Sequence, residues 1–181
     1  GEELRRCYSI CRSRTPGEIS VAVKAIDGGR FSRYAQNDIQ QGMALEVMVP
    51  QGHFGYQPQA GRSADYLAIA AGSGITPMMA IIDATLATEL DSRFTLIYGN
   101  RSSHSMMFRQ ALADLKDRYP QRLQVVHLFS QEAMDSDLLQ GRINGDKLRA
   151  LAARLLDFSR FERAFICGPA AMMDEAEMTL R

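Results

Sequence analysis

Short segments of alternating apolar and polar residues make up the first third of the chain. These segments are residues 5–13, 18–26 and 43–50. In the second of them Ile19, Val21 and Val23 share one face, as expected of a half-buried strand. A paired-glycine turn at Gly28 and Gly29 follows, and a short helix is expected after it. The pattern predicts an antiparallel β unit.

The pattern changes after a Pro-, Gly- and Gln-rich stretch at residues 50–65, which reads as a loop or linker. Continuous apolar runs then alternate with segments of helical spacing. The runs are residues 66–71, 94–99, 123–130 and 163–168. Such runs between helices are typical of a parallel sheet covered on both faces. We therefore predict an α/β plus β fold with one domain at residues 1–62 and another at residues 63–181.

The composition limits which partners and which cellular compartment are expected for this protein. Lys plus Arg and Asp plus Glu both number 21, so no net basic charge favours nucleic acid as a partner. The cysteines are Cys7, Cys11 and Cys167, and their spacing fits neither a disulfide framework nor a metal site, which favours a reducing cytoplasm. No apolar run approaches the roughly 20 residues needed to span a bilayer, so no membrane association is expected.

The sequence "GSGITP" directly follows the first apolar strand of the second domain. Gly72 and Gly74 permit close approach of backbone to a ligand, and Pro77 stands at a helix start, where free N–H groups attract phosphate. The G-x-G spacing lacks the third glycine of the dinucleotide fingerprint. From the local sequence a phosphate loop and a plain turn are about equally well supported.

The ends of the other strands carry further polar residues. After the second strand, "YGNRSS" could bind ribose hydroxyls or a phosphate, or form a solvated loop. Ser130 ends the third strand and Arg142 follows it as a candidate phosphate ligand, although a surface arginine is the commoner case. Cys167 ends the fourth strand, and a lone cysteine there is more often a packing residue than a nucleophile.

Two motifs of the first domain are equally ambiguous when each is taken alone. Arg6 and Tyr8 lie on one face of a strand, where they could bind a phosphate and stack on a planar ring, or simply face solvent. The turn that contains Gly29 and Ser32 could hold a pyrophosphate or only reverse the chain.

The order of these motifs along the chain is more specific than any one of them. The order is R-x-Y-S, G-x-x-S, G-x-G-x-T-P, Y-G-x-R and C-G-P-x-x-M. It resembles the ferredoxin-NADP reductase family, and most closely the reductase components of multicomponent oxygenases. The resemblance implies a partial antiparallel flavin-binding β-barrel, followed by a parallel-sheet nucleotide-binding domain.

The resemblance also implies two cofactors and the residues that bind them. For FAD these are Arg6, Tyr8, Ser9, Val23, Lys24, Gly29, Arg30, Phe31 and Ser32. For NADPH they are Gly72, Ser73, Gly74, Thr76, Pro77, Arg101, Ser130, Arg142, Cys167 and Gly168. Hydride would pass from the nicotinamide to the flavin, with Ser9, Thr76 and Cys167 nearest the reacting atoms. NADH is the alternative donor, because Gln131 stands where some NADP enzymes of the family have arginine.

The chain departs from the family in its extent. The family barrel has strands before R-x-Y-S, and the oxygenase reductases carry a [2Fe–2S] domain with C-x4-C-x2-C spacing that is not found here. We therefore predict a piece of a longer protein, whose C-terminal region holds the cluster and whose partner is an oxygenase component. Two alternatives stay open. One is a reductase for another acceptor, such as ferredoxin, a haem protein or free flavin, and the other is a regulatory module that binds nucleotide without turnover.

Overall fold

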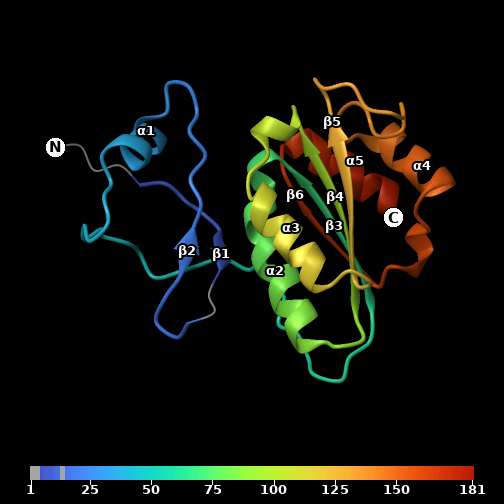
Figure 1. The fold of residues 1–181 in the computed structure, drawn as a ribbon, viewed down its shortest axis with the longest axis horizontal. Coiled ribbons are helices and arrows are strands. Elements are labelled where there is room, and N and C mark those ends of the chain that lie inside the picture. Colours follow the sequence, from blue (N-terminus) through green and yellow to red (C-terminus); the bar gives the residue numbers. More distant parts are fainter. Residues whose placement is uncertain (1–4, 13–14) are drawn as a thin grey trace.

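Long apolar strands in the second part of the chain pair into one parallel sheet with the order β5–β4–β3–β6 (Figure 1). The computed structural model describes residues 5–12 and 15–181. The strands are β3 (Asp65–Ala71), β4 (Arg93–Asn100), β5 (Leu123–Phe129) and β6 (Arg163–Cys167). The helices are α2 (Ile75–Thr88), α3 (Arg109–Arg118), α4 (Gly145–Arg154) and α5 (Ala170–Leu180). Short 3₁₀ turns are η1 (Gly72–Gly74), η2 (Ser103–Ser105) and η3 (Phe158–Arg160). The predicted alternation of strands and helices is confirmed.

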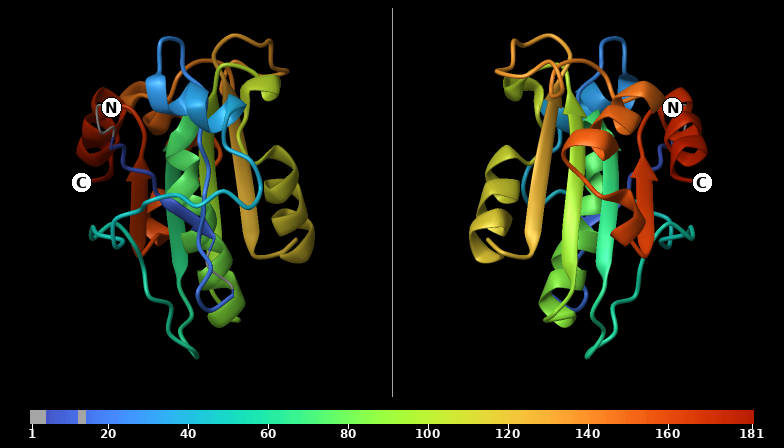
Figure 2. Two further views of the ribbon diagram at one scale, coloured as in Figure 1. Left: turned by 90° about the vertical axis from the view of Figure 1, so that its left-hand side faces the viewer. Right: turned by 90° about the vertical axis from the view of Figure 1, so that its right-hand side faces the viewer.

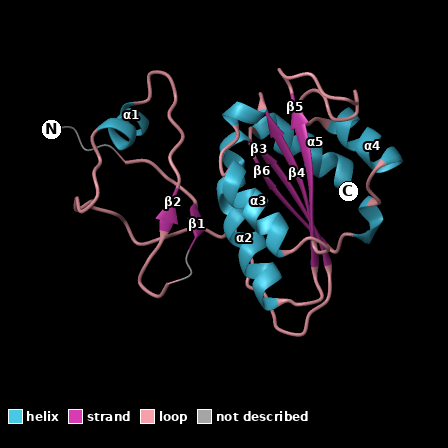
Figure 3. Cartoon of the chain, in the orientation of Figure 1, coloured by secondary structure: helices cyan, strands magenta, loops and turns pink. Residues whose placement is uncertain are grey.

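The sheet separates two apolar layers, which explains why its strands are apolar on both faces. Helices α2 and α3 cover one face, where Tyr66, Phe94 and Tyr98 are fully or almost fully buried. Helices α4 and α5 cover the other face, which contains Leu67 and Ile97. Figures 1 and 3 show this order of layers, with the first part of the chain lying outside α2 and α3.

The first part of the chain contains a small antiparallel sheet and one helix. Strands β1 (Ile10–Arg12) and β2 (Ser20–Val21) pair through Ile10 and Val21, and α1 (Arg30–Asn37) follows the paired-glycine turn. The predicted antiparallel unit and the short helix are therefore confirmed, although both strands are shorter than expected. In Figure 2, α1 lies at the same end of the molecule as the carboxyl ends of the parallel strands.

The third strand predicted for this part, at residues 43–50, is not found in the described structure. Alternation of apolar residues makes a strand only where a neighbouring strand completes its hydrogen bonds, and among the described residues of this unit β1 and β2 pair only with each other. Val47 and Val49 are accordingly 78% and 80% exposed. The boundary at residue 62 stays a prediction.

The connection between the two parts is anchored on a buried carboxylate. Glu89, at the end of α2, is fully buried and accepts hydrogen bonds from Tyr56 and from the backbone of Gln59 in the connecting segment. It also accepts hydrogen bonds from Tyr66 and Ser92 within the α/β part. Four donors therefore surround one charge, and they attach the connecting segment to the amino end of the sheet.

Two features are absent from residues 5–12 and 15–181. None of the helices there combines the length and apolar character needed to cross a bilayer. In the same part of the chain, no three His, Cys, Asp or Glu side chains are arranged to hold a metal ion.

Candidate functional site

The glycine-rich turn after β3 lies where the direction of the sheet's connections reverses. The chain proceeds from β3 to β4 and β5 on one side and then crosses to β6 on the other side of β3. In open α/β sheets this switch point, at the carboxyl ends of the strands, is where ligands bind. The turn therefore lies at the position in the fold with the strongest expectation of a ligand.

Gly72 and Gly74 are each required in this turn, for different structural reasons. Gly72 has φ +54°, in the left-handed region that residues with a side chain rarely adopt, and the space around its Cα is open. Gly74 has no such strain, but a Cβ there would overlap the backbone carbonyl of Cys167. The turns after β3 and β6 are therefore in direct contact, as a site that spans both strands requires.

The beginning of α2 offers backbone donors rather than free side chains. The Thr76 hydroxyl donates to the Ser73 carbonyl at 2.8 Å and is buried, so its proton stabilises the turn. The N–H of Ile75, the first residue of the helix, already donates to the carbonyls of Gly72 and Ser73. The positive dipole of the helix end suits a pyrophosphate. Pro77, in the first turn, removes a donor that the helix does not use.

Cys167 and Gly168, at the end of β6, lie directly against the glycine-rich turn that follows β3. Burial raises the pKa of the Cys167 thiol, so the group is a neutral thiol at neutral pH and is unsuited to act as a nucleophile. A Cβ on Gly168 would lie 3.2 Å from the Ala71 side chain and 2.7 Å from Met172. Small, neutral groups therefore border the space beside the turn.

The three residues predicted to bind the adenosine ribose and its phosphate converge at the ends of β4 and β5. The N–H of Gln131, which follows Ser130, donates to the carbonyl of Arg101 at 2.8 Å. The N–H of Gly141, which precedes Arg142, donates to the carbonyl of Phe129 at 2.8 Å. Arg101 and Arg142 are both exposed. The fold therefore brings the backbone of Arg101, Ser130 and Arg142 to one end of the sheet.

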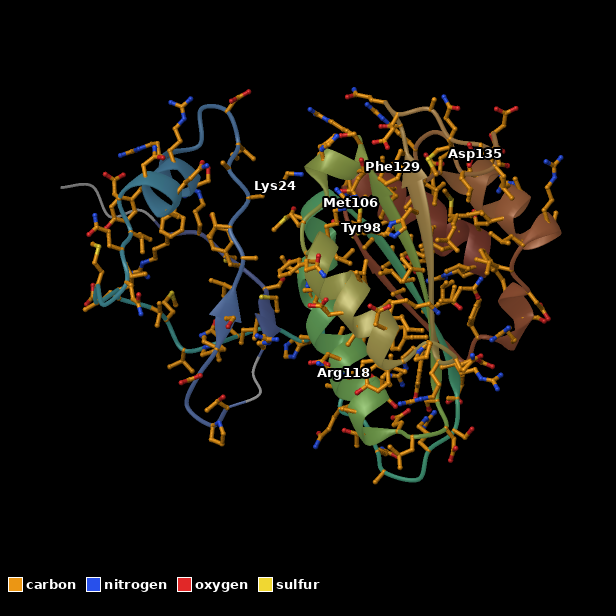
Figure 4. All side chains as sticks on the ribbon, viewed as in Figure 1. Lys24, Tyr98, Met106, Arg118, Phe129 and Asp135 are labelled. Carbon is orange, nitrogen blue, oxygen red and sulfur yellow. The ribbon has the colours of Figure 1, made fainter. Side chains whose placement is uncertain are left out.

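Lys24 and Glu132 hold the loop that follows β4. Glu132 accepts the N–H of Ser103 at 2.6 Å, and this bond is the main reason that the pKa of its carboxyl lies below the ordinary value. Lys24, from the first part of the chain, donates to the carbonyl of Ser105 at 3.2 Å. In Figure 4 the Lys24 side chain extends toward Met106. Lys24, predicted as a flavin residue, thus bridges the two parts of the chain.

Part of the set predicted to bind FAD lies around the start of α1, whereas Lys24 contacts the loop after β4. The rings of Tyr8 and Phe31 lie 5.4 Å apart, and the Arg6 side chain is exposed and donates to the carbonyl of Arg5. Ser32 is buried, and its hydroxyl accepts the N–H of Ile26 at 3.3 Å, so it stabilises the turn. Ser9 and Arg30 are exposed, and Val23 is half-buried.

These residues fit the two chemical parts of a flavin dinucleotide. A Cβ on Gly29 would overlap the Ser32 hydroxyl, so only glycine keeps the backbone this close at the helix start. The free N–H groups of the first turn suit a pyrophosphate, and a planar aromatic side chain suits a planar ring. The roles of individual residues stay predictions.

Three residues of the site lie outside the set predicted to bind the cofactors, although two of them belong to a strand end considered for ribose or phosphate. They are Tyr98, whose hydroxyl donates to the Gly72 carbonyl at 3.1 Å, Asn100 and Glu132. Tyr98 and Asn100 belong to the "YGNR" motif. The motif indicated that this strand end could bind a ligand, but not which of its residues would do so. For Glu132 the sequence carried no signal, because its partner, Ser103, belongs to a different loop.

Comparison with known proteins agrees with this geometry. Residues 68–178 match the family model "Oxidoreductase NAD-binding domain", and residues 1–56 match "Oxidoreductase FAD-binding domain". One component of 1,2-phenylacetyl-CoA epoxidase from Escherichia coli strain K12 is 75% identical over 181 residues, which are 100% of this chain and 51% of that protein.

More distant relatives have related descriptions. The ferredoxin reductase component of 3-ketosteroid-9-alpha-monooxygenase from Mycobacterium tuberculosis (strain CDC 1551 / Oshkosh) is 38% identical over 98% of this chain and 46% of its own. The flavohem-like FAD/NAD binding domain of nitric oxide dioxygenase from Vibrio cholerae superposes with a TM-score of 0.78. That match is 28% identical and covers 97% of this chain and 70% of that chain.

The chain spans about half the length of the curated relatives that it matches. Within that span the FAD-binding match covers the antiparallel unit, and the NAD-binding match covers most of the parallel sheet together with the switch-point glycine turn. The chain therefore belongs to the family of oxidoreductases that combine an FAD-binding with an NAD-binding domain, and its fold is that of the ferredoxin-NADP⁺ reductases.

Proposed function

We propose that the full protein is a cytoplasmic flavin-dependent oxidoreductase that takes electrons from NADPH and delivers them to an oxygenase. The oxygenase we infer is a phenylacetyl-CoA epoxidase, because the E. coli relative that is 75% identical is a component of that enzyme. The C-terminal region of the full protein would carry the [2Fe–2S] cluster that passes single electrons onward.

One observation supports the nicotinamide step above all others. The contact between Gly74 and the carbonyl of Cys167 brings the glycine-rich turn after β3 against the small, neutral turn after β6. A dinucleotide whose pyrophosphate lies at Gly72–Gly74 would then have its nicotinamide beside Cys167 and Gly168. Arg101 and Arg142, at the far ends of β4 and β5, would hold the 2′-phosphate of NADPH through charge-assisted hydrogen bonds.

The remaining residues position the reactants and do not transfer protons. When bound, FAD supplies a ring that accepts hydride and can release electrons singly. Tyr8 would support that ring, and the start of α1 would hold its pyrophosphate, at the end of the molecule where the parallel strands terminate (Figure 2). The Thr76 hydroxyl is engaged with Ser73, and the Cys167 thiol is neutral, so both would border the nicotinamide without offering a base.

Full-length protein, reconstituted with FAD, tests the proposal. We expect a visible flavin spectrum that bleaches on anaerobic addition of NADPH and returns when the oxidised epoxidase components are added. A plant-type ferredoxin and a haem protein serve as alternative acceptors. A protein that binds FAD but is not bleached by NADPH or NADH would contradict the reductase proposal, and equal reoxidation by every acceptor would contradict the assignment of the oxygenase.

A further inference from the structure

Asn100, the last residue of β4, carries a buried amide with no partner. Asn100 is 8% exposed, and neither its Nδ2 nor its Oδ1 makes a hydrogen bond within the geometric limits to the described residues. Buried polar groups are paired in the great majority of cases, because leaving one unpaired costs free energy. The amide therefore has hydrogen-bonding capacity that the described residues leave unused and that a ligand can take up.

The surroundings of Asn100 contain further unused hydrogen-bonding capacity. Asn100 alternates with Tyr98 along β4, so both side chains lie on the face covered by α2 and α3. Tyr98 donates to the carbonyls of Gly72 and Met107. Burial raises the pKa of the Tyr98 hydroxyl, and the neighbouring Asn100 amide acts in the opposite direction, so the two side chains lie close together. On the neighbouring strand, the Nδ1 atom of His127 is likewise buried and unpaired.

Two aromatic side chains on β5 border this region. Phe129 is the direct strand partner of Asn100, and its ring lies parallel to that of His127 at 6.0 Å. Burial lowers the pKa of His127, so its ring is neutral at neutral pH. Figure 4 shows Tyr98, Met106 and Phe129 clustered near the carboxyl ends of β4 and β5. An uncharged amide next to neutral rings suits a neutral, planar ligand better than a phosphate.

The order of the strands indicates which part of a dinucleotide would reach Asn100. Cys167 ends β6, the glycine turn ends β3, and Asn100 ends β4, and these strands are neighbours in that order. Adjacent strands lie about 4.8 Å apart, so the three positions extend across roughly 10 Å of the sheet edge. With the pyrophosphate at the glycine turn and the nicotinamide beside Cys167, β4 and β5 receive the adenosine.

We propose that Asn100 recognises the adenine base of the nicotinamide dinucleotide, an inference that rests on the proposed function. Its Oδ1 would accept a hydrogen bond from the 6-amino group, and its Nδ2 would donate to the adjacent ring nitrogen. A carboxamide presents one donor and one acceptor in a plane, which is the complement of an adenine edge. Arg101 and Arg142 are suited to the 2′-phosphate, which accepts hydrogen bonds but cannot donate them when ionised.

Equilibrium binding to full-length protein tests this inference independently of turnover. The probes are NADP⁺ and its hypoxanthine analogue, in which a carbonyl replaces the 6-amino group, and dissociation constants are measured by calorimetry. We expect the wild-type protein to bind the analogue roughly tenfold more weakly, the loss typical of a mismatched bidentate contact. Asn100→Ala should bind NADP⁺ about tenfold more weakly and no longer distinguish the two ligands.

Arg142→Ala is the matched control, because loss of a phosphate ligand should weaken both dinucleotides by the same factor. If Asn100→Ala misfolds, Asn100→Ser and the wild-type comparison still decide the question. Equal affinity of the wild-type protein for both ligands would overturn the inference, as would equal discrimination by wild type and variant, which would mean that water satisfies the amide.

Reduced nicotinamide mononucleotide separates failure of this inference from failure of the proposed function. This donor lacks adenosine, so it should reduce the bound flavin equally well in the wild-type protein and in Asn100→Ala. Flavin reduction that is slowed in the variant with this donor would overturn the adenine assignment. Failure of the wild-type flavin to accept electrons from any nicotinamide donor would instead refute the reductase proposal and leave the binding comparison valid.

Discussion

Removal of the buried carboxylate of Glu89 should destabilise the fold strongly. The carboxylate accepts hydrogen bonds from Tyr56 at 2.6 Å, Ser92 at 2.7 Å, Tyr66 at 2.8 Å and the N–H of Gln59 at 3.0 Å. Tyr66 and Ser92 are fully buried, so water cannot replace the lost acceptor. The remaining oxygen neighbours are the Tyr56 hydroxyl at 2.7 Å from Tyr66 and the Arg62 carbonyl at 3.3 Å from Ser92, so the lower part of the range below applies where these accept the freed protons. Each buried unsatisfied hydroxyl costs about 1–3 kcal/mol, which predicts a loss of about 2–6 kcal/mol for Glu89→Ala.

A Glu89→Gln variant makes this prediction easier to measure. A protein of this size is stable by only about 5–15 kcal/mol, so Glu89→Ala can approach complete unfolding. The amide keeps the shape and one acceptor oxygen but places donors against hydroxyl donors, and we expect a loss of about 1–3 kcal/mol. Asp174, an exposed carboxylate on α5, provides the control, because Asp174→Asn should change stability by less than about 0.5 kcal/mol.

The pH dependence of unfolding gives a second readout for Glu89. Burial alone would raise the pKa of this carboxyl, but the hydrogen bonds outweigh it, so its pKa lies below the ordinary value. A lowered folded-state pKa means that the stabilisation is complete above the unfolded-state pKa and is lost as the pH falls through the folded-state pKa. Wild type should therefore lose stability in the acidic range more steeply than Glu89→Gln.

Urea denaturation of both proteins between neutral and acidic pH measures these effects through the free energy of unfolding. The reasoning would be refuted if Glu89→Gln matched wild type within experimental error at neutral pH. A difference between the two proteins that did not shrink on acidification would contradict the assignment of a charged Glu89.

Three further predictions concern the switch point, the end of α2 and the choice of coenzyme. Gly74→Ala should cost about 1–3 kcal/mol of stability and weaken NADPH binding, whereas Gly55→Ala, where the space is open, should do neither. Arg122→Ala should lower the free energy of unfolding by about 2–4 kcal/mol, since its guanidinium donates to three carbonyls at the end of α2, at 2.8–3.3 Å. Arg142→Ala should weaken NADPH binding about tenfold and leave NADH binding unchanged, while the exposed Arg154→Ala should affect neither. An unchanged preference for NADPH over NADH would rule out the role of Arg142.

Most of the strands and helices, and their order along the chain, could be predicted from the sequence. Continuous apolar strands predicted the parallel sheet because a strand covered on both faces needs apolar residues at every position. The alternating pattern was less reliable, since residues 43–50 have it but form no strand in the described structure. The order of the motifs carried the resemblance to the family. That the motifs of the second part share one edge of the sheet could also be predicted, because the carboxyl ends of parallel strands lie at the same edge.

By itself, the sequence determined the switch-point turn, with glycines at Gly72 and Gly74, but not the reason for each glycine. Only the tertiary structure decided that Gly72 needs a left-handed backbone and that Gly74 leaves room for the carbonyl of Cys167. The sequence likewise did not indicate the hydrogen-bond partners of Glu89 or the unused hydrogen-bonding capacity of the Asn100 amide. Hydrophobic periodicity is a property of neighbouring residues, whereas hydrogen bonds and close contacts join segments that are distant in the chain and meet only when it folds.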